Sequence, residues 1–164
     1  MKQFSKKQTE RLVKNYTKKQ MSLEEVLEKV FKGETKLGPS ASSIESVEEF
    51  KRLFVAIVRS GEVELFRANN TFILLYSKTS EEETAIFDLF SPETNEKLAM
   101  IDFYLAVSKL KLLGYEEAIT YTQGEKNKQF ATKMLSDIAV IEDSDDPTRG
   151  EYMVSVDLTE LGAQ

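Results

Sequence analysis

Residues 62–90 read EVELFRANNTFILLYSKTSEEETAIFDLF, and the fold class follows from them. Residues 62–67 alternate between polar and apolar side chains, which is the period of a half-buried strand. Residues 71–77 and 84–90 are rich in the aromatic and branched side chains that strands favour. The two asparagines at 69–70 predict a tight turn, since asparagine tolerates a positive φ. The sequence therefore predicts three consecutive strands that form an antiparallel meander.

Two helices are expected before these strands. Ser22 with Glu25, and Ser46 with Glu49, each form a capping box, and each box opens an apolar pattern of helical period. A glycine ends each pattern. The apolar positions are Leu23, Val26, Leu27, Val30 and Phe31 before Gly33, and Val47, Phe50, Leu53, Phe54, Ile57 and Val58 before Gly61. The second set is broad, so we expect that helix to present a wide buried face.

A long helix is expected after the meander. Ser91 is placed as its N-cap and Pro92 in its first turn, which predicts a helix over residues 93–113. Leu98, Ile101, Leu105 and Leu112 are expected to face the core. The elements predicted beyond it are a strand at 118–122, a short helix at 126–135, and strands at 138–141 and 152–158 joined by an acidic turn at 142–150.

These patterns predict the α+β class. We expect a mixed, mainly antiparallel sheet of five to six strands with flanking helices, in a single domain spanning residues 21–164. The side chains expected in its core are Phe54, Ile57, Phe72, Leu74, Ile86, Ile101 and Leu105.

Composition excludes several chemistries. The chain has no cysteine and no histidine, which removes disulfides, thiolate metal sites and Ser-His or Cys-His dyads. Residues 1–20 lack the apolar stretch of a signal peptide, and no run of apolar residues approaches the length of a membrane span. We therefore expect a cytoplasmic protein with no membrane association and no metal site.

Charge is distributed unevenly along the chain. The net charge is −6, yet residues 1–20 carry about +6, which leaves about −12 on the remainder. We expect residues 1–20 to be a basic helical arm. A plain solvated helix or tail is the default explanation, and the functional alternative is that the arm attracts an anionic partner, either a protein or a nucleic acid. The arm residues expected to bind a partner are Lys6, Lys7, Arg11, Lys14, Lys18 and Lys19.

The element order from about residue 45 to 158 resembles the GCN5-related N-acetyltransferase (GNAT) superfamily. The resemblance rests on a long helix that ends in Leu-Leu-Gly-Tyr, a strand reading Ala-Ile-Thr-Tyr-Thr, and Asn127 opening a short helix that carries Phe130. It implies that the strand at 84–90 splays from the strand at 118–122 and that the pantetheine arm of acetyl-CoA lies between them. If acetyl-CoA binds, the residues implied to contact it are Phe87, Leu89, Ser91, Thr94, Asn95 and Asn127.

The cofactor loop departs from the family pattern. The superfamily binds pyrophosphate through a glycine-rich loop at the start of the long helix, because backbone amides must approach the phosphates closely. Residues 91–97 contain no glycine, and they carry Pro92, Glu93 and Glu96. Phe130 or Met134 stands near the position of the family's general-acid tyrosine.

We therefore expect a non-catalytic or catalytically degenerate GNAT-like protein that acts by binding another macromolecule, without a cofactor. Small phage proteins include members of this kind, so the resemblance implies a phage protein in the host cytoplasm or the virion as one reading. Two alternatives stay open. One is an active N-acetyltransferase with an atypical pyrophosphate loop. The other is a small acidic inhibitor or decoy of a host enzyme.

Three further groups of side chains have both a functional and a structural explanation. The carboxylates at 142–146 could bind a cation, but their spacing fits no EF-hand loop, which favours a solvated turn. Glu62, Glu64 and Asp88 could act as acids or bases, or could simply face solvent from the sheet. The tyrosines expected to border the splayed strands are Tyr76, Tyr104, Tyr115 and Tyr121, either as ligand contacts or as rim residues of the core.

Overall fold

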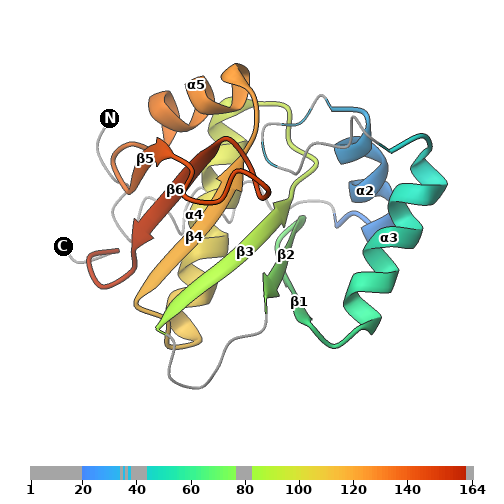
Figure 1. The fold of residues 1–164 in the computed structure, drawn as a ribbon, viewed down its shortest axis with the longest axis horizontal. Helices are drawn as coiled ribbons and strands as arrows, with labels where there is room; N and C mark the ends of the chain where they lie inside the picture. Colours follow the sequence, from blue (N-terminus) through green and yellow to red (C-terminus); the bar gives the residue numbers. More distant parts are fainter. Residues whose placement is uncertain (1–19, 34, 36, 38–43, 77–82, 162–164) are drawn as a thin grey trace.

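The computed structural model describes residues 20–33, 35, 37, 44–76 and 83–161. Their helices and strands follow the predicted order closely (Figure 1). The helices are α2 (Leu23–Phe31), α3 (Val47–Arg59), α4 (Glu96–Leu112) and α5 (Glu125–Met134). The strands are β1 (Val63–Ala68), β2 (Thr71–Tyr76), β3 (Thr84–Phe90), β4 (Glu117–Thr122), β5 (Ala139–Asp143) and β6 (Tyr152–Asp157).

The six strands form one mixed, mainly antiparallel sheet in the order β1-β2-β3-β4-β6-β5. The predicted meander is confirmed, because β1 pairs antiparallel with β2 and β2 with β3. β4 joins β3 in parallel after the crossover through α4, and β6 lies between β4 and β5. The α+β class predicted from the sequence is therefore correct.

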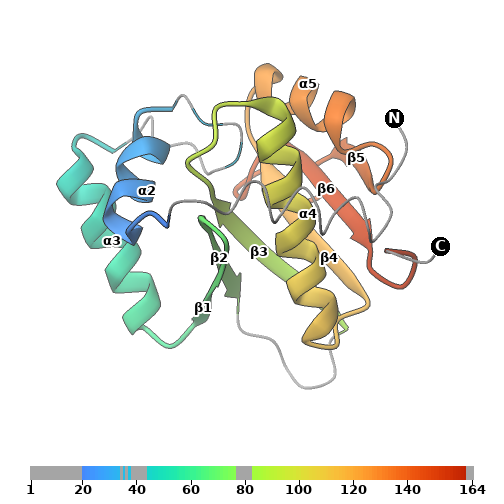
Figure 2. The ribbon, with the colours of Figure 1, turned by 180° about the vertical axis from the view of Figure 1, so that it is seen from behind.

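The helices cover both faces of the sheet. Phe72 and Leu74 of β2 pack with side chains of α2 and α3, whereas the alternating neighbours Ile73 and Leu75 pack with side chains of α4 and α5. Successive side chains of a strand point to opposite faces, so the two helix pairs lie on opposite sides of the sheet. Figure 2 shows α4 crossing the face turned away from the viewer in Figure 1.

The local signals at the two early helices are confirmed. The Ser22 hydroxyl accepts a 3.2 Å hydrogen bond from the Glu25 amide, and the Ser46 hydroxyl accepts one of 3.1 Å from the Glu49 amide. The β1–β2 turn also forms as expected, with Asn69 at a φ of 58°. Arg67 secures this turn to the start of α2, because its guanidinium donates to the carbonyl of Met21 and to the side chain of Asn70.

The start and the orientation of α4 differ from the prediction. The helix begins at Glu96 rather than Glu93, with Asn95 as its N-cap instead of Ser91. Leu112 was expected in the core but is 85% exposed. It lies two residues from the fully buried Leu110, and residues at that spacing point to opposite sides of a helix.

Four of the seven expected core side chains are buried, and three are only half-buried. The buried ones are Phe54, Phe72, Leu74 and Ile101, and the half-buried ones are Ile57, Ile86 and Leu105. The broad buried face predicted for α3 is also narrower than expected. Only Phe50 and Phe54 of that helix are buried, and Leu53 is 50% exposed.

Candidate functional site

The most distinctive feature of the sheet lies between its two parallel strands. β3 and β4 pair only over Thr84–Ile86 and Glu117–Ile119. Beyond this point β3 continues to pair with β2 through Phe90, and β4 continues to pair with β6 through Thr122. Since each strand keeps its outer partner but loses its inner one, the sheet opens between residues 87–90 and 120–122. We call this opening the gap.

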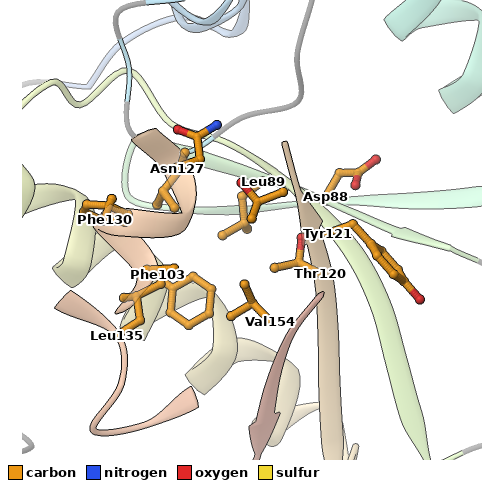
Figure 3. Close-up of a pocket in the computed structure, with 12 residues that line it drawn as sticks. Asp88, Leu89, Phe103, Thr120, Tyr121, Asn127, Phe130, Leu135 and Val154 are labelled. Carbon is orange, nitrogen blue, oxygen red and sulfur yellow. The ribbon is translucent and has the colours of Figure 1, made fainter. Parts of the chain in front are cut away.

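Side chains fill most of the gap on the face covered by α4 and α5. A cavity of about 40 Å³ remains there, which is room for a few water molecules. Figure 3 shows Phe103, Leu135 and Val154 pointing toward one another inside it, whereas the side chains of Asp88 and Tyr121 point away. The lining residues are Leu37, Asp88, Leu89, Phe103, Thr120, Tyr121, Thr122, Asn127, Phe130, Ala131, Leu135 and Val154.

Two of the six residues implied as cofactor contacts meet at this cavity, namely Leu89 and Asn127. The Asn127 side-chain amide donates to the carbonyl of Gln123. Phe87 belongs to the core and is fully buried. Thr94 is exposed in the segment that leads into α4.

The last two implied contacts, Ser91 and Asn95, are occupied by structural bonds. Ser91 is fully buried, and its hydroxyl donates a 2.6 Å hydrogen bond to Oδ2 of Asp102. Oδ1 of Asn95 accepts from the amides of Lys97 and Leu98 at 2.9 and 3.2 Å. These amides would otherwise be donors at the helix N-terminus.

On the opposite face, a pair of polar side chains stands beside the gap. Tyr76 of β2 donates a 2.6 Å hydrogen bond from its hydroxyl to Oδ2 of Asp88 on β3. Burial raises the pKa of Asp88 above its ordinary value, although the Tyr76 hydroxyl and the positive charge of Arg149 oppose this effect. Burial, followed by the nearby charge of Asp88, also raises the pKa of Tyr76. Both shifts favour the protonated forms.

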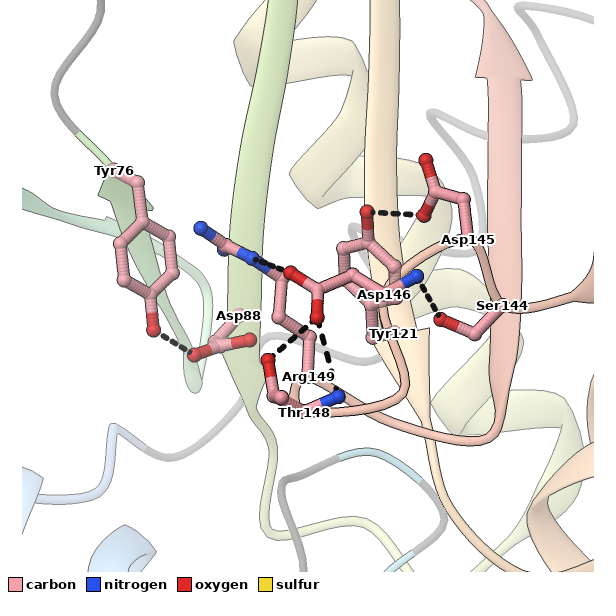
Figure 4. A network of polar contacts seen from close by, with 8 residues as sticks. All are labelled: Tyr76, Asp88, Tyr121, Ser144, Asp145, Asp146, Thr148 and Arg149. Atoms are coloured by element: carbon pink, nitrogen blue, oxygen red, sulfur yellow. Dashed lines mark hydrogen bonds and ion pairs between the residues drawn. The ribbon is translucent and has the colours of Figure 1, made fainter.

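The loop between β5 and β6 places a guanidinium beside this pair (Figure 4). The Arg149 guanidinium carbon lies 5.3 Å from the ring centroid of Tyr76 and 5.9 Å from that of Tyr121. Its Nε lies 3.3 Å from Oδ2 of Asp146, while the Tyr121 hydroxyl donates to Asp145 at 3.0 Å. The acidic turn is therefore organised around hydrogen bonds and an arginine, as a solvated turn would be.

A second and much larger hollow extends from Tyr76 and Asp88 along α3. This groove has a volume of about 490 Å³, and it is open to solvent rather than enclosed. We call it the α3 groove. Its lining residues are Ile44, Phe50, Leu53, Phe54, Ala56, Ile57, Ser60, Glu62, Leu74, Tyr76, Asp88 and Phe90. Asp88 thus borders both hollows, the cavity in the gap and the α3 groove.

The sequence marked some of these residues and missed others. Tyr76 and Tyr121 border the gap as expected, whereas Tyr104 and Tyr115 are half-buried against the main core. Glu62 and Glu64 are exposed, as charges facing solvent would be, but Asp88 is half-buried. Arg149 was not singled out. Its only sequence signal is a single cation after four carboxylates in the turn at 142–150.

Three other expectations concern a metal ion, a membrane span and the basic arm. Among residues 20–33, 35, 37, 44–76 and 83–161, no group of three or more acidic side chains is arranged to hold a metal ion. In the same ranges, no helix is long and apolar enough to cross a bilayer. The six basic arm residues, from Lys6 to Lys19, lie outside the described residues.

No protein-family model matches the chain, and no curated protein sequence is significantly similar to it.

Proposed function

We propose that this chain is a catalytically degenerate GNAT-like protein that acts by binding another macromolecule. The observation that carries the proposal is the small volume that side chains leave in the gap. A cofactor of the size of acetyl-CoA needs a pocket of several hundred Å³, on the order of 300 Å³ or more, whereas the cavity between β3 and β4 measures about 40 Å³.

The start of α4 supports the same proposal. A pyrophosphate bound there would need free backbone amides. The Asn95 side chain already accepts from the amides of Lys97 and Leu98, and Ser91 is engaged with the buried Asp102. Glu96 in the first turn of the helix is also engaged, because its carboxylate pairs with the Lys133 ammonium at 2.9 Å. These residues serve the helix rather than a ligand.

The α3 groove supplies a surface for the proposed binding. The sequence gives α3 a wide apolar face, and only Phe50 and Phe54 of that face are buried. Leu53 remains 50% exposed and lines the groove with Ile57. Exposed apolar patches of this kind are typical of interaction sites.

Calorimetry with acetyl-CoA at millimolar concentration tests the proposal. We expect no isotherm, because the gap has no room for the pantetheine arm. Tight binding, with a dissociation constant in the micromolar range, would refute it.

One observation favours a second candidate, an N-acyltransferase. Asp88 borders both the gap and the α3 groove, and burial raises its pKa above the ordinary value of a carboxyl group, which makes it a stronger proton acceptor. This candidate requires acetyl-CoA binding, release of the CoA thiol in the presence of primary amines, and loss of that release in Asp88→Asn. If no amine tested causes release of the thiol, the acyltransferase candidate is rejected and the proposed binding function is kept.

A further inference from the structure

The α3 groove has an apolar body. Phe50, Phe54 and Phe90 lie close together along it, with ring centroids 6.3 Å apart for Phe50 and Phe90 and 5.0 Å apart for Phe54 and Phe90. Leu53 and Ile57 of α3 form part of the wall. The groove is open to solvent rather than enclosed, so a segment of a larger molecule can enter it. Its shape therefore suits a segment of a larger partner.

Among the described residues, the two charged side chains that line the groove are both acidic. They are Glu62, which is exposed, and Asp88, which is half-buried. Helix α3 also ends beside them at Ser60, and the C-terminus of a helix carries partial negative charge. One end of the apolar groove therefore attracts a cation.

The partner groups of Asp88 favour one kind of cation. The Tyr76 hydroxyl binds Oδ2, and within the described part of the chain Oδ1 accepts no hydrogen bond. The Tyr76 ring already stacks with a guanidinium, that of Arg149, at 5.3 Å. A planar guanidinium can bind a carboxylate and lie on an aromatic ring, which an ammonium group does less well.

We propose that the α3 groove binds a hydrophobic segment of a partner protein that carries an arginine, and that this arginine binds Asp88 and stacks on Tyr76. The proposal rests on the binding function proposed above and names the chemistry of its partner. Apolar side chains of the segment cover Leu53, Ile57 and the phenylalanine rings. Ion pairing with Asp88 fixes the position of the segment along the groove.

Arg149 competes with the incoming arginine. Its guanidinium occupies the neighbourhood of the Tyr76 ring, and its charge opposes a second cation near Asp88. Arg149 is exposed and paired with Asp146, so it can leave the ring without unfolding the core. Removing this side chain should therefore strengthen binding, whereas removing Asp88 should weaken it.

A selection from a displayed library of random dodecapeptides tests the proposal on the full chain. We expect the enriched peptides to carry an arginine between apolar residues. The strongest peptide is then measured by fluorescence polarisation, together with a version in which citrulline, the neutral isostere of arginine, replaces that residue. We expect citrulline to weaken binding by at least about tenfold. This comparison uses the unmodified protein, so it does not depend on the folding of a variant.

Protein variants locate the contact. Asp88→Asn should weaken the arginine peptide by at least about tenfold and leave the citrulline peptide nearly unchanged, because the two changes remove one interaction. Arg149→Gln should strengthen binding several-fold, and Leu53→Ser should weaken it. Leu112→Ser is the control, since Leu112 is 85% exposed but does not line the groove.

Three outcomes would overturn the inference: no enriched peptide, enriched peptides without arginine, or equal affinities of the arginine and citrulline peptides. Apolar peptides without a cation would assign the groove to apolar packing alone. Each of these results is separate from the acetyl-CoA titration. If no arginine peptide is enriched and acetyl-CoA gives no binding isotherm, the arginine partner is rejected and the proposed binding function is kept. Micromolar acetyl-CoA binding rejects the function itself.

Discussion

The Tyr76 hydroxyl donates a 2.6 Å hydrogen bond to Oδ2 of Asp88 across two neighbouring strands. Asp88 lies directly opposite Leu74 in the register of β2 and β3, so Tyr76 reaches it diagonally on the same face of the sheet. Burial raises the pKa of both side chains. Tyr76 lines the α3 groove and Asp88 lines both the groove and the cavity in the gap, so this hydrogen bond lies where the two hollows meet.

Tyr76→Phe should destabilise the protein by about 1–3 kcal/mol, because it leaves a half-buried carboxylate without its hydroxyl donor. Urea unfolding followed by circular dichroism measures the change. The control is Tyr121→Phe, whose hydroxyl meets Asp145 at the surface, and its effect should stay below about 0.5 kcal/mol. If the two substitutions change the free energy of unfolding equally, the bond to Asp88 stabilises the protein no more than the surface bond to Asp145 does.

Asp88→Asn should change how stability depends on pH. The pKa of Asp88 is raised in the folded protein above the value of about 3.9 in an unfolded chain. Protonation of Asp88 therefore stabilises the folded protein fully at pH values below about 3.9. This stabilisation is lost as the pH rises through the raised native pKa. The stability of wild type relative to the variant should fall as the pH rises above about 4, the pKa of an unfolded aspartate.

Urea unfolding at several pH values measures this difference. Leu112→Ser provides the reference, because it removes no titrating group and should differ from wild type by an amount independent of pH. If wild type instead gains stability over Asp88→Asn as the pH rises, the native pKa of Asp88 lies below its ordinary value. The burial argument would then be wrong.

Phe54→Ala should cost about 3 kcal/mol, at the lower end of the range for buried phenylalanines. Phe54 is 5% exposed and meets the Phe90 ring edge-on, but the adjoining groove already admits solvent. The matched control is the next residue, and Val55→Ala should change stability by less than about 0.5 kcal/mol because Val55 is 40% exposed. An unchanged thermal midpoint for Phe54→Ala would show that this face of α3 is not packed.

The sequence predicted the elements whose signals are local. Capping boxes and strand periods depend on neighbouring residues, so Ser22, Ser46 and the β1–β2 turn were correctly assigned. The start of α4 was wrong because Ser91 finds a partner in Asp102, a contact that no local pattern encodes. The sequence correctly identified the apolar side chains of α3 but predicted more of them to be buried than the structure buries. Periodicity does not say how closely a helix approaches a sheet.

The candidate site was harder to predict for the same reason. Asp88 occupies a polar position in an alternating strand, which normally faces solvent. Its surroundings include the Tyr76 hydroxyl from the neighbouring strand and the charge of Arg149 from a loop far along the chain. The narrowing of the gap depends on Phe103, Leu135 and Val154, three apolar residues from different elements. Single-sequence patterns identify such residues as core but do not show which space they fill.

Ser91→Ala should destabilise the protein by about 1–3 kcal/mol, because the buried Asp102 carboxylate loses the donor 2.6 Å away. Thermal and urea unfolding measure the loss. Ser108→Ala, at a half-buried position on α4, controls for removal of a serine hydroxyl and should have a smaller effect. If Ser91 served a cofactor instead, its removal would leave the stability of the free protein unchanged.

Removal of residues 1–19 should leave a folded protein. Every helix and strand of the described residues lies beyond this segment. Hydrogen bonds of the Met21 backbone attach the start of α2 to the β1–β2 turn. The Met21 amide donates to Oδ1 of Asn70 at 2.9 Å, and its carbonyl accepts from Arg67. A longer deletion through Ser22 removes both of these bonds and the N-cap of α2, so it should cost about 1–3 kcal/mol.

The shorter deletion also tests whether residues 1–19 bind a partner or are only a solvated tail. The arm carries about +6 and the rest of the chain about −12, so loss of the arm should weaken association with an anionic partner. For the intact chain, that association should fall as salt rises, because dissolved ions screen the attraction between opposite charges. Heparin, a polyanion, is a suitable probe for chromatography at increasing salt. Equal retention of the intact and shortened chains would leave recognition to the α3 groove, and an insoluble shortened chain would show that residues 1–19 belong to the core.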